Sequence, residues 1–410
     1  MRPTRGAPTA LLLTAVLLLA LNLRLSVNAL GTVLPEIRTD LGLGSAGAGL
    51  LLSFPPLVFA FAGILTPAAA ARIGNHRLVV LALVTATAGQ LIRAWIGGSA
   101  ALFAGTLVSL AGLAIGNVLM PGLIRQHFAA HITTVTSGYV TMLSLGAAVA
   151  SGLSIPIENA LGGSWRTVFT LWAAVSVIAL LPWLVIAVGS RAEPSRGRRS
   201  AVPLRALTRS PLAWAMVVLF GVQSGHVYVV VGWFGQVLLD AGISEVKMGA
   251  LLSVAPAIGI GLSLTVPVLL RRQRWALPLI LFFSGCYLAG YLGLVFNPVG
   301  GSWAWLVLVG LGGGTFPTAL TLVALRARTP DGVIALSAFT QCVGYLMGAL
   351  GPFVFGLLHH PGGSWTPSLV LMMVLLLPMA ASGFAVARPR FLESEIRLPG
   401  SSQPDGPARG

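Results

Sequence analysis

The sequence predicts an all-α polytopic membrane protein with 12 transmembrane helices, arranged as two six-helix bundles that repeat each other. Hydrophobic residues make up 56% of its 410 residues and charged residues only 9%, with a mean hydropathy of +0.90. A soluble domain carries roughly 25% charged residues. Apolar runs long enough to cross a bilayer recur along the whole chain, and residues 200 positions apart match.

Gly, Pro, Ser and charged residues interrupt the apolar runs, and these interruptions indicate where the predicted helices end. The run after Met1–Arg5 is too long for a signal peptide, so we expect it to remain as the first span. The predicted helices cover residues 10–37, 46–71, 77–97, 100–126, 133–158, 165–189, 211–238, 246–270, 275–297, 303–326, 333–358 and 366–387.

The placement of the basic residues predicts the orientation. With both termini on one side, most of the 25 Lys and Arg residues fall on that side, while Arg38, Arg166 and Lys247 fall on the other. Arg24 and Arg93 lie within spans. This asymmetry predicts a multi-pass protein of the plasma (bacterial inner) membrane with cytoplasmic termini, and anionic membrane lipids as partners of the basic residues.

Four segments follow from this pattern. Residues 1–189 form an N-terminal six-helix bundle, and residues 211–387 form a C-terminal one. Residues 190–210 carry six arginines and no apolar run, and predict a cytoplasmic basic linker. Residues 388–410 are polar and predict a disordered cytoplasmic tail.

The two bundles are related in sequence. The pairs share an offset of 200 residues, and they include Asp40 with Asp240, Gly42 with Gly242, Pro67 with Pro267, and Gly162–Trp165 with Gly362–Trp365. Because both copies begin on the same side, the repeat is parallel, an arrangement of secondary transporters that bind substrate near the midplane between the halves.

Several local motifs add a family resemblance. They are Asn22–Leu25 with Leu34–Ile37, Ile115–Pro121 with Ile124–Arg125, Gln223–Ser224 with Tyr228 and Trp233, and Leu336–Ser337 with Gln341–Tyr345. With 12 spans, a basic central loop and a 6+6 repeat, the chain resembles the major facilitator superfamily, and within it the CynX/NimT family. Leu25 stands where that family has proline, and Ala71 where the superfamily loop motif has an acid.

The resemblance implies a secondary transporter of a small substrate, such as cyanate or a 2-nitroimidazole. It also implies alternating access, in which the two bundles rock about a site near the midplane.

Arg24 is the main candidate for a substrate-binding residue. A charge at this depth costs at least about 3 kcal/mol and is a functional candidate by default. Asn28, Gly31 and Pro35 lie on the same helical stripe. The offset of 200 gives a facing stripe on the seventh span, made of Ser224, Tyr228, Val231 and Gly235. A guanidinium suits carboxylate-like anions. The alternative is a structural arginine bound to carbonyl and polar groups.

Further candidates come from the other central helices. Asn117 and Thr315 could line the pathway or mark helix packing, and Gln223 adjoins Ser224. Three more could contact substrate or bond between helices, namely Tyr139, Gln341 and Tyr345.

Two residues are candidates for energy coupling. His226 has an unperturbed pKa near 6.5, but its repeat mate Ser26 points away from the Arg24 stripe, which favours packing or a lipid edge. Glu36 could belong to a gate or be a solvated helix end. Arg93 is expected to extend to the membrane interface.

Other function classes lack their signatures. There is no phosphate-binding loop, no nucleophile–base pair at a familiar spacing and no metal-ligand cluster, so we expect no enzyme, no cofactor and no metal. Cys286 and Cys342 lie in apolar runs. Topology accounts for the basic charge, so nucleic acid is not expected as a partner, and a monomer is expected.

The function expected is transport of a small anionic or polar solute, cyanate-like, by alternating access. One alternative is an exporter of nitroimidazole-like or other small neutral drugs, with Arg24 structural. Another is a membrane sensor that transports nothing.

Overall fold

The computed structural model describes residues 9–189, 204–360 and 362–396, and these are helical with short connections. Twelve segments are long and apolar enough to cross a membrane, which confirms the predicted fold class. The first half contains α1 (Thr9–Thr32), α2 (Leu34–Leu41), α3 (Ser45–Ile73), α4 (Asn75–Trp95), α5 (Gly98–His127), α6 (Ile132–Ala160) and α7 (Trp165–Gly189). The second contains α8 (Leu204–Leu207), α9 (Pro211–Asp240), α10 (Glu245–Leu270), α11 (Ala276–Phe296), α12 (Ser302–Gly312), α13 (Thr315–Leu325), α14 (Pro330–Leu357), α15 (Thr366–Ala387) and α16 (Leu392–Glu395).

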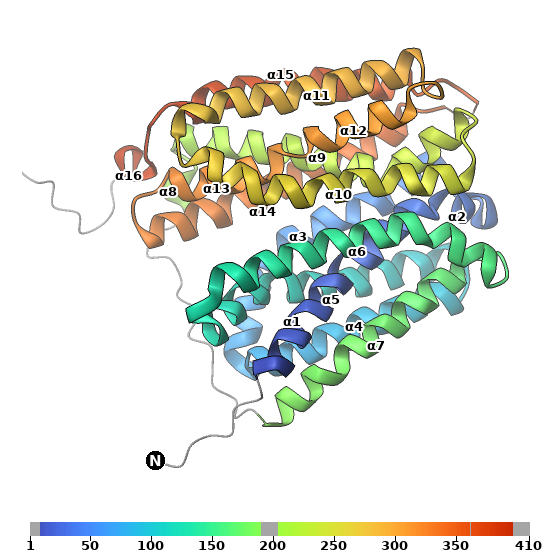
Figure 1. Ribbon diagram of the computed structural model, residues 1–410, viewed down its shortest axis with the longest axis horizontal. Coiled ribbons are helices and arrows are strands. Elements are labelled where there is room, and N and C mark those ends of the chain that lie inside the picture. The colour runs from blue at the N-terminus through green and yellow to red at the C-terminus, as the bar shows by residue number, and fades with distance from the viewer. Residues whose placement is uncertain (1–8, 190–203, 361, 397–410) are drawn as a thin grey trace, which may run out of the picture.

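The two halves are neighbours, and Figure 1 shows the second half above the first. Helices α1 and α4–α7 pack on one another in the first half, and α9 packs on α14 and α15 in the second. The halves meet where α3 packs on α14, α6 on α10 and α1 on α9. The start of α1 and the end of α15 lie at one end of the molecule, the terminus end; we call the opposite end, near α2, the distal end.

Two predicted helices are broken. The first span ends at Thr32, and after Val33 the chain continues as α2 with Pro35 in its first turn. The tenth span is interrupted between α12 and α13 at Gly313 and Gly314. A Cβ atom on Gly314 would lie 2.4 Å from the Phe283 ring, so the break lets the backbone approach α11.

The repeat predicted from the sequence also appears as repeated geometry. The indole of Trp165 donates to Asp40, and the indole of Trp365 donates to Asp240. Gly42 and Gly242 have φ angles of 61° and 87°, which favour glycine and end the preceding helix in both halves. The matching residues therefore carry the same structural role in each half.

The halves approach most closely towards the distal end. A Cβ on Gly31 of α1 would lie 1.8 Å from the carbonyl oxygen of Val231 of α9. On α14, a Cβ on Gly356 would lie 2.9 Å from the carbonyl oxygen of Ser45. Glycine is needed at these positions because any side chain would force the halves apart. Towards the terminus end the ribbons of the two halves separate (Figure 1).

The predicted disordered tail and basic linker are partly ordered. Residues 388–396 lie against the second half, with Leu392 buried and its backbone N–H donating to the carbonyl of Arg326. Apolar Leu392 and Ile396, both buried, explain this docking. Helix α8 falls within the predicted linker. Linker residues 190–203 and tail residues 397–410 lie outside the described chain.

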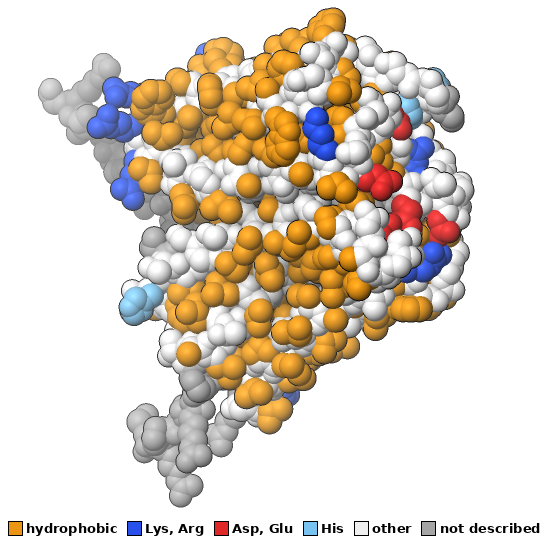
Figure 2. Space-filling view, turned by 45° about the vertical axis from the view of Figure 1, so that its right-hand side comes forward, with side chains coloured by type: hydrophobic (Ala, Val, Ile, Leu, Met, Phe, Trp, Pro, Cys, Tyr) orange, Lys and Arg blue, Asp and Glu red, His pale blue; other side chains and the backbone are white. Residues whose placement is uncertain are grey.

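The surface separates into an apolar band and two polar ends. In Figure 2 hydrophobic side chains cover the middle of the molecule, and acidic side chains gather at the distal end with some basic ones. At the terminus end the coloured charged side chains in this view are Lys, Arg and His. This distribution matches the one expected for a protein embedded in a bilayer.

Candidate functional site

Arg24 lies where α1 faces helices of both halves. Its side chain is partly buried, and its charge acts on the hydroxyl groups of Tyr139 from α6, Tyr228 from α9 and Tyr345 from α14. It is in polar contact with Tyr228. Within the described residues no carboxylate forms an ion pair with Arg24. The structure therefore gathers one cation and three phenol groups around the boundary between the halves.

Tyr139 is tied to the first half. Its hydroxyl donates to Oδ1 of Asn117 on α5 over 3.2 Å. Tyr139 is buried, whereas Asn117 is partly exposed. The predicted candidates Arg24, Tyr139 and Asn117 are thus brought together.

The second half contributes Tyr228 and Tyr345 to the group around Arg24. Their rings meet edge to face with centroids 6.4 Å apart. The Tyr345 ring also packs edge to face on Phe220 at 5.0 Å and lies 6.1 Å from Phe59 of the first half. An aromatic surface therefore adjoins the polar group around Arg24.

Asn28 lies one turn beyond Arg24 and is buried. The next turn reaches Gly31, whose backbone touches Val231 and approaches Gly235 on α9. The predicted stripe of α1 therefore faces the predicted stripe of α9, and Asn28 lies between Arg24 and the closest contact of the halves.

Ser224 and Gln223 are both buried on α9. Ser224 packs on α14, since a Cβ atom added to Gly348 would lie 2.8 Å from the Cβ atom of Ser224. Gln223 is fully buried and its Nε2 donates to Ser224. The Ser224 side chain therefore belongs to the α9–α14 contact.

Two further candidates do not join the Arg24 group by any contact found in the described chain. Thr315 is fully buried, donates to the carbonyl of Gly312 and bonds to Tyr287 of α11. Gln341 donates to Ser337 one turn earlier on α14 and is partly exposed.

His226 is buried inside the second half. Its Nδ1 lies 2.7 Å from the hydroxyl of Tyr291, and its ring stacks on Tyr287 with centroids 4.8 Å apart. Packing is the observed environment, and placement at a lipid edge is wrong. Its repeat mate Ser26 likewise points into its own half, where it accepts a hydrogen bond from Arg93.

Arg93 corrects a second expectation, because its side chain does not extend to the interface. It is 1% exposed, donates to Ser26 over 2.7 Å, and stacks its guanidinium 3.6 Å from the Phe169 ring centroid. The reason is that α4 turns this face towards α5 and α7 rather than lipid.

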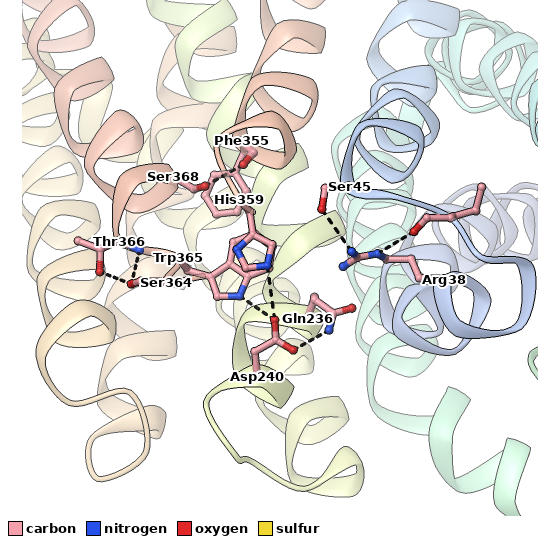
Figure 3. A network of polar contacts seen from close by, with 11 residues as sticks. Arg38, Ser45, Gln236, Asp240, Phe355, His359, Ser364, Trp365, Thr366 and Ser368 are labelled. Carbon is pink, nitrogen blue, oxygen red and sulfur yellow. Dashed lines mark hydrogen bonds and ion pairs between the residues drawn. The ribbon is translucent and has the colours of Figure 1, made fainter. Parts of the chain in front are cut away.

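The distal end holds a second polar network (Figure 3). Arg38 of α2 donates to the Leu43 carbonyl and Ser45, and its guanidinium lies 5.6 Å from the Trp233 ring of the other half. Burial lowers the pKa of Arg38, and the charge of Asp240 opposes this shift. Arg38 thus couples the first half to Trp233 and Asp240 of the second.

The carboxyl groups of the distal end differ in their partners. Hydrogen bonds from Trp165 and Arg166 lower the pKa of Asp40. His359 stacks on Trp365 at 3.6 Å and lies 4.0 Å from Asp240; burial lowers its pKa although Asp240 acts against this. Glu36 accepts a hydrogen bond from the backbone N–H of Trp165 over 3.0 Å, so it is not simply a solvated helix end.

Sequence reasoning missed residues that adjoin these sites. Phe59 and Phe220 pack on Tyr345, and apolar residues of this kind give no separate signal in a chain rich in them. In the sequence, Arg38 stands out only as a charge that indicates topology. Glu158, at the end of α6, is 8% exposed, and its place on the last turn of a predicted span is the signal that the sequence offers for it.

Comparison with known proteins gives three relatives over nearly the whole chain. A sequence profile described as Major Facilitator Superfamily matches residues 16–352. An uncharacterized transporter of Bacillus subtilis (strain 168), YycB, is 33% identical over 93% of this chain and 94% of its own. The 2-nitroimidazole transporter of Escherichia coli (strain K12) is 32% identical, covering 96% and 98%. The cyanate transport protein CynX of the same organism is 26% identical, covering 86% and 91%.

The fold also matches solved structures. A bacterial homologue of the human lysosomal transporter Spinster, in an inward-facing and unoccupied conformation, superposes with a TM-score of 0.73. The match covers 96% of this chain and 99% of that chain at 16% identity. At 16% sequence identity this similarity shows a common fold only.

Proposed function

Since this chain belongs to the major facilitator superfamily of transporters, we propose that it carries a small anion such as cyanate across the membrane, with Arg24 binding the negative charge. The family assignment supports transport, and the named relatives are transporters rather than enzymes. The choice of an anion goes further, and rests on the chemistry around Arg24.

The supporting observation is a guanidinium that lacks an acidic partner in the described chain and faces three phenol hydroxyls from both halves. Burying an unpaired charge is expensive unless something compensates it. A small anion would pair with Arg24, while the hydroxyls of Tyr139, Tyr228 and Tyr345 would donate hydrogen bonds to it. Because these groups come from α1, α6, α9 and α14, such a ligand would contact both halves at once.

Alternating access is the mechanism that this arrangement supports. The close glycine contacts between the halves lie towards the distal end. Rocking about the Arg24 region would separate Gly31 from Val231 and bring the terminus ends together. A ligand bound by both halves would favour the states in which both sets of groups reach it.

A planar nitro-aromatic compound is the second candidate. The 2-nitroimidazole transporter is 32% identical to this chain. A nitro group could accept hydrogen bonds from Arg24, and its ring could stack among Tyr345, Phe220 and Phe59. This candidate uses the same cation with an aromatic surface that cyanate does not need.

The membrane setting is part of the proposal. The concentration of Lys and Arg on the side of the termini supports cytoplasmic termini in a bacterial plasma membrane, in contact with anionic lipids. We infer a monomer, because the pathway and its candidate residues come from one chain.

A ligand-dependent thermal shift distinguishes the two substrates. The purified protein is heated with cyanate, other small anions or 2-nitroimidazole, since a ligand that binds the folded state raises the melting temperature. A shift with small anions that is absent in R24A supports the anion proposal. A shift with 2-nitroimidazole alone favours the second candidate, and a shift that is the same in R24A contradicts a binding role for Arg24.

A further inference from the structure

Three carboxyl groups from three elements gather at the distal end. Glu158 lies at the end of α6 and is 8% exposed, Glu36 lies in the first turn of α2 and is partly buried, and Glu245 begins α10 of the other half. Helices α6 and α10 pack directly on each other at this end, where a Cβ on Gly249 would lie 3.0 Å from the carbonyl oxygen of Ser151.

The carboxyl groups of Glu36 and Glu158 lie within hydrogen-bonding reach of each other. One oxygen of Glu36 accepts from the backbone of Trp165. Oε2 of Glu158 is buried, and no donor reaches it from any described residue. Two ionised carboxylates have only acceptors, so they can bond to each other only when one of them carries a hydrogen. A proton on either carboxyl group would make that group the donor that this contact lacks.

The charged groups around this pair leave its charge uncompensated. Arg38 on α2 is directed to Leu43, Ser45 and Trp233, and Arg166 on α7 pairs with Asp40. From α9, Asp240 accepts from Trp365 near His359. Arg24 of α1 faces the tyrosines, and Lys247 of α10 forms no ion pair within the described chain. The charge that acts on Glu158 besides Glu36 is that of Glu245, another negative group.

We propose that Glu36 and Glu158 form a proton-binding site, and that its occupancy holds the distal ends of the two halves together. When the halves meet, Glu245 of the second half approaches the pair. Glu245 is exposed, whereas Glu158 is buried; like charges repel each other more strongly where one of them is buried, and binding one proton removes a negative charge from the group. The closed distal end therefore binds a proton more tightly than the open one. By linkage, acid favours closure and alkali favours opening.

A metal ion fits this place less well than a proton. No group of three His, Cys, Asp or Glu side chains in the described residues lies close enough to hold one. The inference also stands apart from the substrate, because it uses none of the groups around Arg24.

Double electron–electron resonance tests the linkage. Spin labels are placed at Leu161 of the first half and Val299 of the second, both exposed at the distal end, after Cys286 and Cys342 are replaced by alanine. We expect the short-distance population to fall as the pH rises, along a one-proton curve. In E158Q and in E36Q, which keep a hydrogen-bond donor without the charge, the short distance should persist at all pH values.

Glu245→Gln is the matched control. It removes the only charge that reaches the pair from the described part of the second half but leaves the pair itself, so the dependence of the short distance on pH should be lost or strongly reduced. Infrared spectra should show the band of a protonated carboxyl group in the wild type and its loss in E158Q. A transition that is unchanged in E158Q and E36Q overturns the proposal. So does a transition that depends on Na⁺ rather than on pH.

Discussion

The indole Nε1 of Trp365 donates a hydrogen bond to Oδ2 of Asp240 over 2.9 Å, which reproduces the bond of 3.1 Å between Trp165 and Asp40, 200 residues earlier. In the first half the bond joins α2, which follows the first spanning helix, to the start of α7, and in the second half it joins the end of α9 to the start of α15. A tryptophan and an aspartate far apart in sequence thus close each six-helix bundle at the same place.

Replacing these indoles tests whether the repeated bond stabilises both bundles. Hydrogen bonds to charged groups contribute about 1.5–3 kcal/mol, and the carboxylates are 40% and 38% exposed, which lowers the value. We expect W165F and W365F each to lose about 1 kcal/mol of unfolding free energy. Denaturant unfolding of the purified protein measures this. Trp305→Phe is the control, because that indole donates to a neutral carbonyl; a larger loss in W305F would refute the prediction.

His359 should make stability depend on pH. Burial against Trp365 lowers its pKa, so the folded state favours the neutral ring. The stabilisation is complete above the unfolded pKa of about 6.5 and is lost as the pH falls towards the lower folded pKa. Melting temperatures between pH 7 and pH 5 should fall less in H359Q than in the wild type. His360→Gln, at the exposed neighbour, should keep the wild-type slope; equal slopes in all three proteins would contradict this role.

Arg38 should favour contact between the halves, whereas Arg166 acts within one half. Arg38 faces Trp233 and Asp240 of the second half, while Arg166 pairs with Asp40 of its own. With spin labels at Leu161 and Val299, R38A should increase the open population of the distal end several-fold and R166A should leave it nearly unchanged. The opposite ranking would show that Arg38 does not hold the halves together.

The buried Arg93 predicts which of two substitutions lowers the stability of the protein. Its charge is buried and has no acidic partner in the described chain, and Ser26 supplies its hydrogen bond. Replacing a buried charge by an apolar side chain of similar shape is often neutral or stabilising, whereas removing its partner leaves it unsatisfied. We expect R93M to keep its melting temperature and S26A to lose about 1–3 kcal/mol. Calorimetry or denaturant unfolding measures the stability of both variants. A higher stability of S26A than of R93M would contradict this prediction.

The sequence predicted the fold well because its signals are strong and repeated. Apolar runs indicated the spans, and the offset of 200 indicated two related halves. It also placed the Arg24 stripe opposite α9, since Gly31 of that stripe touches Val231. Whether Arg24 and its neighbours bind substrate stays a prediction.

Other features needed three-dimensional information. Periodicity places Ser224 on the same face as Tyr228, and only the structure shows that Ser224 packs on Gly348 of α14. Arg93 lies near a predicted helix end, and only the packing of α4 shows that it faces inwards. Composition suggested a disordered tail, yet buried Leu392 and Ile396 are enough to dock it. The Glu36–Glu158 pair depends on where α2 turns after Val33.

Uptake of radiolabelled cyanate into liposomes containing the wild type, R24A or R24K tests the central claim most directly. Exposed Arg390→Ala serves as the control, with protein content matched in every preparation. We predict that R24A abolishes uptake, that R24K keeps a fraction of it because the charge remains without the planar fork, and that competing small anions inhibit the wild type. Full cyanate uptake by R24A would contradict the account.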